Sequence, residues 1–226
     1  IVSGTPIAAE LAQKAQVTVP LTLYSLAIAL VVALPLGIFA AYRRLALPSR
    51  LLSVFGVVAA AIPAVWAGLL GIVVFSTWLG WLPSQGFPRS GWEDPFAAIR
   101  SLTLPALTIG LIEAAILFRF VKSATLSALG AEHLRTAMSR GYTRFGALVR
   151  HGLPGVGLSV ISMLGLQVAG LLVGAVVIEQ LFSLPGLGRM LVVDVGQRDL
   201  IKVQSTLFVL TAVILALGAL VDVAHR

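Results

Sequence analysis

The sequence predicts an all-α polytopic membrane protein, and three observations lead to this class. Hydrophobic residues make up 58% of the 226 residues, and the mean hydropathy is +1.01. Charged residues make up only 11%, whereas a soluble domain carries about 25%. The charges also stand in short groups between uncharged runs that are long enough to cross a bilayer core of about 30 Å. We therefore expect lipid to be the solvent of most of the chain.

Five apolar segments have the length of a transmembrane helix, which needs about 20 residues. The longest uncharged run, 51–88, also leaves room for an apolar loop after its helix. Pro35, Pro63 and Pro105 lie in or at the ends of apolar runs, where proline removes a backbone donor and kinks a helix. The predicted spans are residues 17–42, 51–79, 102–124, 155–182 and 203–224.

Basic residues are shared unequally between the segments that join these spans. The segments 43–50 and 119–154, together with the C-terminus, contain ten basic residues and one acid. The segments 1–16, 80–100 and 183–202 contain six basic residues and five acids. Positive charge collects in the cytoplasmic segments of membrane proteins. We therefore expect an external N-terminus and a cytoplasmic C-terminus.

The sequence has none of the motifs that would make this chain an enzyme by itself. No Gly-x-x-x-x-Gly-Lys-Ser/Thr segment is present, so we expect neither catalytic residues nor ATP hydrolysis. His133 and His151 have no third ligand nearby, so no metal site is expected. Because the basic residues alternate with apolar runs, membrane topology explains them without a nucleic-acid partner. A membrane-embedded enzyme is poorly supported, and no cofactor is expected in the chain.

Four polar side chains fall inside the predicted spans or at their ends. They are Glu113, Gln167, Glu179 and Asp222. Ionisable groups inside a membrane are costly and are functional candidates by default. Pairing with a neighbour, or a place near a helix end, is the alternative for each of the three acids. Three isolated acids do not make a proton relay, which disfavours a secondary transporter.

One basic stretch, EHLRTAMSRGYTRFGALVRHGLPG, interrupts the apolar pattern at Glu132–Gly155. Its apolar residues recur every three or four positions, which is typical of a helix with one apolar stripe. Gly141 lies within the pattern but suits a helix C-terminus, and Thr143 is well placed to cap a new helix. The stripe comprises Leu134, Met138, Tyr142, Phe145, Leu148 or Val149, and Gly152.

This spacing predicts two short helices, 131–140 and 143–152, joined by a sharp turn. Leu153 and Pro154 then mark the entry to the next span. A rigid helical hairpin has a suitable shape for docking to a soluble partner. An amphipathic helix that lies in the lipid interface, with its basic side toward the headgroups, is the alternative.

The same stretch resembles the EAA signature of bacterial ABC importer permeases. The motif RTA, three residues, G, nine residues and HGLP, from Arg135 to Pro154, follows the spacing of that signature. His151 departs from the usual isoleucine. The form of the motif is similar to that of dipeptide, oligopeptide and nickel importers, and Leu164–Leu191 looks like their fourth span and Pro-Gly-Leu-Gly loop. The resemblance covers nearly the whole chain.

The resemblance implies a type I ABC importer permease bundle with 1–16 as an external segment and 17–226 as a transmembrane permease domain. In that family, paired helices like those of the loop 130–154 dock into a groove of a cytoplasmic ATPase and transmit its closure. We expect the segment 135–137 and Gly141 at the docking surface. The full set of implied coupling residues is Glu132, Arg135, Thr136, Ala137, Arg140, Gly141, Thr143, Phe145, Leu153 and Pro154.

The implied function is that of a permease subunit in a binding-protein-dependent importer of di- and oligopeptides in the bacterial plasma membrane. The implied partners are a second homologous permease, two cytoplasmic ATPases that hold ATP and Mg, an external solute-binding protein and lipid. Import of nickel, glutathione or another small ligand is the alternative within the class. A secondary transporter or channel, which would work without ATP and without partners, is the alternative from another class.

Both ends of the chain depart from the family pattern. Family members usually carry one more span and an external segment before the point at which this chain begins, and the chain starts at Ile1 without a methionine or a signal peptide. A short tail with Asp-Pro-Arg is also usual, and it is absent after Arg226. We expect the sequence to be a core that lacks both ends.

Overall fold

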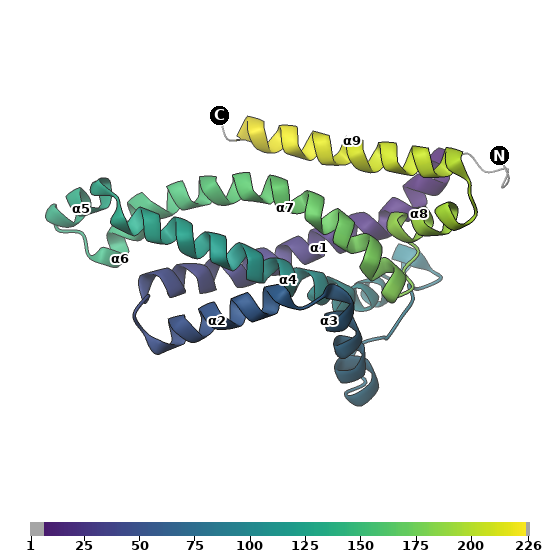
Figure 1. The fold of residues 1–226 in the computed structure, drawn as a ribbon, viewed down its shortest axis with the longest axis horizontal. Helices are drawn as coiled ribbons and strands as arrows, with labels where there is room; N and C mark the ends of the chain where they lie inside the picture. The colour runs from purple at the N-terminus through teal and green to yellow at the C-terminus, as the bar shows by residue number, and fades with distance from the viewer. Residues whose placement is uncertain (1–6, 225–226) are drawn as a thin grey trace.

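A computed structural model describes residues 7–224 of the chain, except for some side chains near the end of its last helix. Within that range the chain forms helices and connecting loops and no strand, as the all-α prediction requires. Three long helices run side by side through the centre: α1 (Ile7–Tyr42), α4 (Pro95–Gly130) and α7 (Leu153–Leu181). Helix α2 (Leu47–Ala61) packs beside α1 and α4, and α9 (Leu200–Ala224) lies along one edge (Figure 1).

Helix α1 begins ten residues before the predicted span, at Ile7 instead of Val17. The residues between them, IAAELAQKAQ, contain neither proline nor glycine and consist mostly of good helix formers. The helix therefore extends beyond the predicted span, and the division into an external segment 1–16 and a membrane domain 17–226 stays a prediction. The external location of the first turns stays a prediction.

The predicted second span, 51–79, is not one helix, which corrects the expectation from hydropathy. Helix α2 ends at Ala61, and α3 (Ala64–Gly71) continues into the π-helical segment η1 (Ile72–Trp78) after a bend of 101°. Pro63 lacks a backbone donor, and its ring drives the preceding residue out of the helical region. Ile62 accordingly has φ −74° and ψ 124°.

Helix α4 crosses the whole bundle without a break, although Pro105 lies inside it. Its start is fixed locally, because the Asp94 side chain accepts a hydrogen bond from the Ala97 N–H at 3.1 Å and Pro95 occupies the first turn. Gly37 of α1 and Gly110 of α4 bring the two helices close together. A Cβ at Gly110 would lie 2.8 Å from the Ser25 carbonyl oxygen of α1, so only glycine allows this approach.

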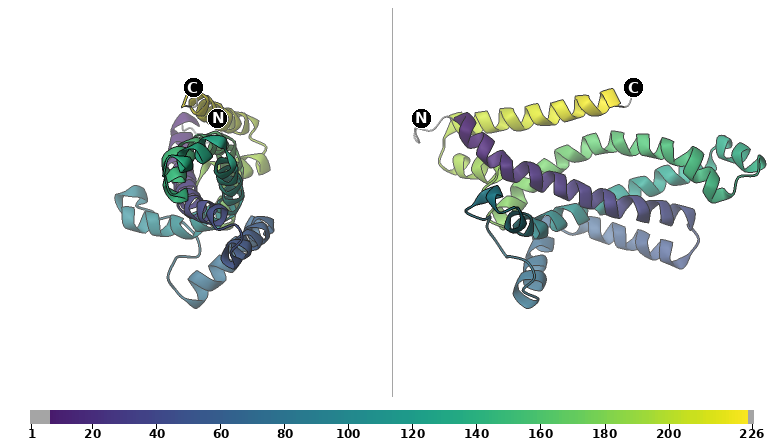
Figure 2. Two further views of the ribbon diagram at one scale, coloured as in Figure 1. Left: turned by 90° about the vertical axis from the view of Figure 1, so that its left-hand side faces the viewer. Right: turned by 180° about the vertical axis from the view of Figure 1, so that it is seen from behind.

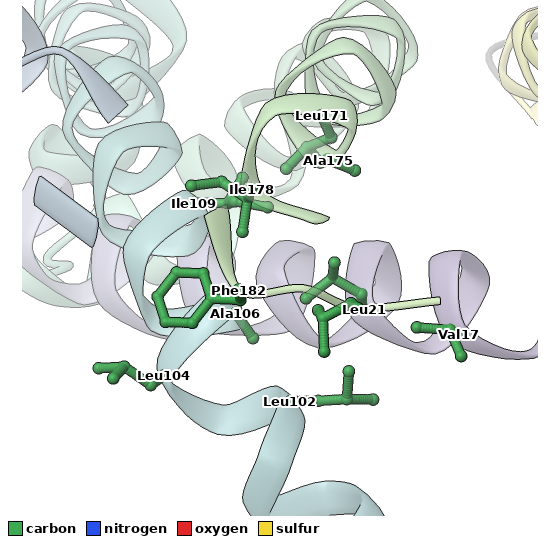
Figure 3. Packing of buried hydrophobic residues seen from close by; sticks show 11 residues of the cluster. Val17, Leu21, Leu102, Leu104, Ala106, Ile109, Leu171, Ala175, Ile178 and Phe182 are labelled. Carbon is green, nitrogen blue, oxygen red and sulfur yellow. The ribbon is translucent and has the colours of Figure 1, made fainter. Parts of the chain in front are cut away.

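The apolar core follows the line where α1, α4 and α7 meet. At one end of that line Leu21 of α1 and Leu102 of α4 are buried together with Leu171 and Ile178 of α7 (Figure 3). Phe182, directly after α7, is 1% exposed and completes this cluster. Because lipid tails are as apolar as leucine, close packing of these side chains stabilises the bundle through van der Waals contacts. The three helices therefore form a stable frame for the segments at both ends.

The connecting segments fall into two groups at opposite ends of the bundle (Figures 1 and 2). One end carries the 43–46 turn and a hairpin made of α5 (Glu132–Ser139), α6 (Arg144–Ala147) and the π-helical turn η3 (Leu148–Gly152). The other end carries α8 (Leu187–Gly196). This separation matches the two groups of loops that differ in charge.

The helices of the described range differ in whether they are long enough to cross a membrane. By length and composition, α1, α4 and the continuous helix Arg144–Leu181 are each able to cross a membrane. The bent pair α2 and α3–η1 adds a fourth crossing if it acts as one span, and the apolar stretch Leu200–Ala216 of α9 is shorter. The predicted total of five spans stays a prediction.

Candidate functional site

The predicted hairpin is present, and its turn has the geometry that the sequence indicates. Gly141 has φ +93°, a value that favours glycine. The Gly141 N–H donates to Met138 O at 3.0 Å and the Tyr142 N–H donates to Ala137 O at 3.3 Å. This pair of bonds is a Schellman motif that closes α5. The Thr143 hydroxyl then accepts from the Gly146 N–H at 3.1 Å and caps α6. The structure confirms both the turn and the cap.

The inner face of the hairpin is fixed to the ends of the long helices. Leu134 of α5 and Leu148 of η3 are fully buried and pack against Ile38 and Tyr42 of α1. Ala137 belongs to the same cluster and is only 6% exposed. The prediction that Ala137 lies at the exposed docking surface is therefore wrong, because its methyl group fills the space between the two arms.

The outer face of the hairpin carries most of the residues that the motif implies. Leu153 is half-buried. The exposed members are Glu132, Arg135, Thr136, Arg140, Gly141, Thr143, Phe145 and Pro154. The predicted single apolar stripe is divided, because the chain reverses at Gly141. Its members Leu134 and Leu148 point inward, whereas Phe145 remains 57% exposed.

Aromatic and cationic side chains alternate on the exposed side of the hairpin. The Phe145 ring meets the Tyr42 ring edge-on, with 5.8 Å between centroids, and the Arg144 guanidinium lies 5.2 Å above the same Tyr42 ring. Tyr142 packs edge-on against His151 at 5.4 Å. Arginine and aromatic side chains are enriched among the residues that dominate binding energy at protein interfaces. The face therefore has the composition of a docking surface.

The second arm of the hairpin continues directly into the next long helix. Residues Arg144–Leu181 form one helical segment, so the predicted separation of a short helix 143–152 from a span 155–182 is wrong. Pro154 would clash with the carbonyl four residues before it in a regular α-helix. The wider π-helical turn η3, in which the Leu153 N–H donates to Leu148 O, accommodates this proline. A force on α6 is therefore transmitted straight into α7.

Two of the predicted intramembrane polar residues form a pair between α4 and α7. The Gln167 side-chain amide donates to the Glu113 carboxylate at 2.8 Å and to the Glu113 carbonyl oxygen at 3.0 Å. Gln167 is 5% exposed, and Glu113 is half-buried. The pair lies near the middle of both helices, so Glu113 fits the alternative of pairing with a neighbour, and its role on a path through the membrane stays a prediction.

Glu179 is a structural anchor, which agrees with the alternative of pairing with a neighbour. Its carboxylate is fully buried and accepts from the Thr18 hydroxyl at 2.6 Å and from the Arg189 N–H at 3.0 Å. The same Thr18 oxygen accepts from the Leu187 N–H at 2.8 Å. A Cβ at Gly186 would overlap the Glu179 carboxylate. Sequence analysis did not find Thr18, because nothing in the local pattern connects it with a residue 161 positions away.

Three other residues considered in the sequence are Asp222, His133 and His151. Asp222 lies in α9, and its side chain is outside the described residues. His133 and His151 are both exposed and line one groove at the hairpin end. Across the described ranges, no group of three His, Cys, Asp or Glu side chains is placed to hold a metal ion.

Fold and hairpin together define a polytopic helical membrane protein with a docking element at one end of its bundle. The family model described as "Binding-protein-dependent transport system inner membrane component" matches residues 33–226. The chain belongs to this family, and it is a permease of the ABC importer class in the inner membrane. The match includes the hairpin, Glu179 and the end of α1 from residue 33, whereas Thr18 lies before it.

Two curated relatives cover nearly all of the chain. A protein of Brucella abortus (strain 2308) with the name "Putative peptide transport system permease protein" is 34% identical over 220 residues, which are 97% of this chain and 70% of the relative. The glutathione transport system permease protein GsiC of Escherichia coli (strain K12) is 34% identical over 225 residues, which are 100% of this chain and 71% of the relative.

Proposed function

We propose that this chain is the permease subunit of an ATP-driven importer of short peptides, coupled to a cytoplasmic ATPase through the hairpin of α5 and α6. One observation carries the proposal: a hairpin that is rigid inside and exposed outside projects past the end of the bundle (Figure 1). The names of the two relatives, which concern peptides and glutathione, support the substrate class.

The arrangement of the hairpin suggests how ATPase closure reaches the spans. The partner would hold the outer face at Arg135, Thr136 and Arg140. The buried leucines on the inner face keep the two arms from sliding on α1 and α4, so the hairpin moves as one body. Because α6 continues into α7, that movement tilts the helix that carries Gln167. Nucleotide binding on the partner would thus select one of two states of the permease.

The assembly that we propose contains a second homologous permease, two cytoplasmic ATPase subunits with ATP and Mg, and an external solute-binding protein. ATP hydrolysis would belong to the partners, because the sequence carries no phosphate-binding loop. The binding protein would deliver substrate to the segments 80–100 and 183–202. Affinity purification in mild detergent with mass spectrometry tests this composition, and recovery of the chain alone, folded and at full yield, would contradict it.

The orientation that we propose places the hairpin in the cytoplasm and α8 outside. Ser139 and Gln197 are both exposed and lie at opposite ends of the bundle. The sequence contains no cysteine, so single cysteines at these two positions are clean probes. A membrane-impermeant thiol reagent applied to spheroplasts should label Gln197→Cys and spare Ser139→Cys. The reverse pattern would invert the topology.

Glutathione is the second candidate substrate, because one relative bears its name. Uptake into proteoliposomes that contain the full complex separates the candidates, with L-alanyl-L-alanine, glutathione and Ni²⁺ as probes. We expect ATP-dependent uptake of the dipeptide when the binding protein is present. Uptake of glutathione or Ni²⁺ in its place would move the chain to that substrate class. Transport by the chain without ATP and without partners would overturn the proposal as a whole.

A further inference from the structure

A cavity of about 220 Å³ lies at the end of the bundle opposite the hairpin, between the first turns of α1, the loop 185–186 and α8. Four charged residues line it: Glu10 and Lys14 from α1, and Arg189 and Asp194 from α8. Two carboxylates and two cations thus face a space that nothing in the described chain fills. The coupling hairpin and the Glu113–Gln167 pair contribute nothing to this cavity.

One end of the cavity is basic and lies next to the Glu179 anchor. The Arg189 N–H is bonded to the Glu179 carboxylate, which places the start of α8 there, and Lys14 is close enough to the same carboxylate to interact with it electrostatically. Both cationic side chains are half-buried. Over residues 7–224, neither side chain has a hydrogen bond or an ion pair. This end therefore favours an anionic group.

The other end of the cavity is acidic. Asp194 is only 4% exposed, and its Oδ2 atom has no hydrogen-bond partner within the described chain. Lys202 of α9 is near, but its ammonium group is bonded to Glu10 at 2.9 Å, and its backbone N–H is bonded to Asp199. Three carboxylates thus share one cation. Burial raises the pKa of Asp194, Lys202 opposes this rise, and Glu10 and Asp199 add to it.

The spacing of the charged residues along α8 is close to the length of a short peptide. Arg189 and Asp194, which would hold opposite ends of a ligand, are five residues apart on α8, a rise of about 7.5 Å along the helix axis. An extended dipeptide spans about 7 Å between its ends, whereas one amino acid spans about 3.5 Å. The rise between these two residues is thus closer to the length of a dipeptide than to that of a single amino acid.

We propose that this cavity binds a dipeptide by its two end groups, with the carboxylate at Lys14 and Arg189 and the ammonium group at Asp194. The inference rests on the proposed function, because it gives the peptide substrate a receiving site in the permease itself. Each end group meets a side chain of the opposite charge that lines the cavity. The ammonium group also supplies the partner that the buried Asp194 oxygen lacks.

Direct binding to the purified complex in nanodiscs, without the binding protein, tests this site. The probes are L-alanyl-L-alanine, its N-acetyl derivative and its C-terminal amide. We expect both blocked peptides to bind the wild type at least 10-fold more weakly than the free dipeptide. Asp194→Asn should weaken the free dipeptide about 10-fold and leave the N-acetyl derivative unchanged. Arg189→Gln should likewise weaken the free dipeptide about 10-fold and leave the C-terminal amide unchanged. Arg198→Gln, which changes an exposed residue outside the cavity, should alter the binding of none of the three probes.

Several outcomes would overturn the site. They are no binding of the free dipeptide at millimolar concentration, equal binding of all three probes by the wild type, or equal weakening of all three by Asp194→Asn. The comparison of blocked peptides on the wild type needs no variant to fold. If the complex takes up peptide with the binding protein but binds no peptide directly, the cavity site is contradicted and the proposed function is not. Direct binding without any peptide uptake would remove the proposed function instead.

Discussion

Each end of the bundle contains a glycine at a change of chain direction, but the polar groups around the two glycines differ in exposure and in the range of their hydrogen bonds. At the hairpin end Gly141 and the Thr143 cap are exposed, and the hydrogen bonds of the turn are local. At the opposite end Gly186 is buried against Glu179, and the bonds of Glu179 and Thr18 connect residues that are far apart in the sequence. The first turn is determined locally, whereas the second depends on the assembled fold.

This difference indicates what each end stabilises. The Glu179 carboxylate connects α7 to α1 and α8, and it makes its hydrogen bonds within the chain. Arg135 and Arg140 on the hairpin are exposed and make no side-chain hydrogen bond inside the described range. Charged and aromatic groups without an internal role are available for another molecule. Substitutions at the anchored end should therefore reduce stability, and substitutions on the outer hairpin should reduce function.

The largest effect on stability is expected for Gly186→Ala. The new methyl group would overlap the Glu179 carboxylate, which is fully buried and held by two donors, so neither group has room to move. We expect loss of most of the monodisperse protein in fluorescence-detected size-exclusion chromatography. Gly196→Ala, at the end of the helix that Gly186 precedes, is the matched control, since a Cβ there meets nothing within 4 Å. Equal yields of the two variants would mean that the loop around Gly186 rearranges easily.

A smaller but clear loss of stability is expected for Thr18→Val. The change keeps the shape of the side chain but removes the hydroxyl that donates to Glu179 and accepts from the Leu187 N–H. Two buried polar groups then lack a partner, at a cost of about 1–3 kcal/mol each. Thr22→Val is the control, because the Thr22 hydroxyl bonds only to the carbonyl of its own helix. Thermal unfolding in detergent should separate the two variants, and equal midpoints would argue against the anchor.

The smallest effect on stability is expected for Phe145→Ala on the hairpin. The ring is 57% exposed and has one edge-on contact with Tyr42, which is worth about 0.5–1.5 kcal/mol. The unfolding midpoint should move by only a few degrees, while recovery of the ATPase subunits in affinity purification should fall several-fold. Full recovery of the ATPases would show that this face does not bind them. A midpoint as low as that of Thr18→Val would remove the contrast between the two ends.

Local signals in the sequence were sufficient to predict the hairpin. Gly141 and Thr143 each act on their own few residues, so a glycine with positive φ and a hydroxyl cap are recognisable without the fold. The all-α membrane class was also predictable, because it depends on composition. Pro63 indicated a kink, but the size of the bend was not predictable, because hydropathy averages over a window and joined both sides into one span, 51–79.

Features that depend on contacts across the fold were not predictable. The family resemblance placed Ala137 at the docking surface, but the side that the hairpin buries is decided by the position of α1 and α4. The partner of Glu179 lies 161 residues away, so the sequence indicated only that a buried acid needs one. The continuity of α6 with α7 was missed because Pro154 normally marks a helix start, and the π-helical turn that tolerates it here leaves no known local pattern.

The central claim, that the hairpin couples the ATPase to the spans, is tested most directly by one measurement. The measurement is ATP hydrolysis by the reconstituted complex of wild type and Gly141→Val, with and without loaded binding protein. Gly141 has space around it but a φ of +93°, so valine adds backbone strain of about 1–2 kcal/mol or more and turns the exposed arginines away from their partner. The account predicts normal abundance and a loss of at least 10-fold in stimulation by the binding protein, whereas Gly157→Val in α7 should keep it. Stimulation of Gly141→Val at the wild-type level would contradict the account and leave the hairpin as a lipid-contacting element.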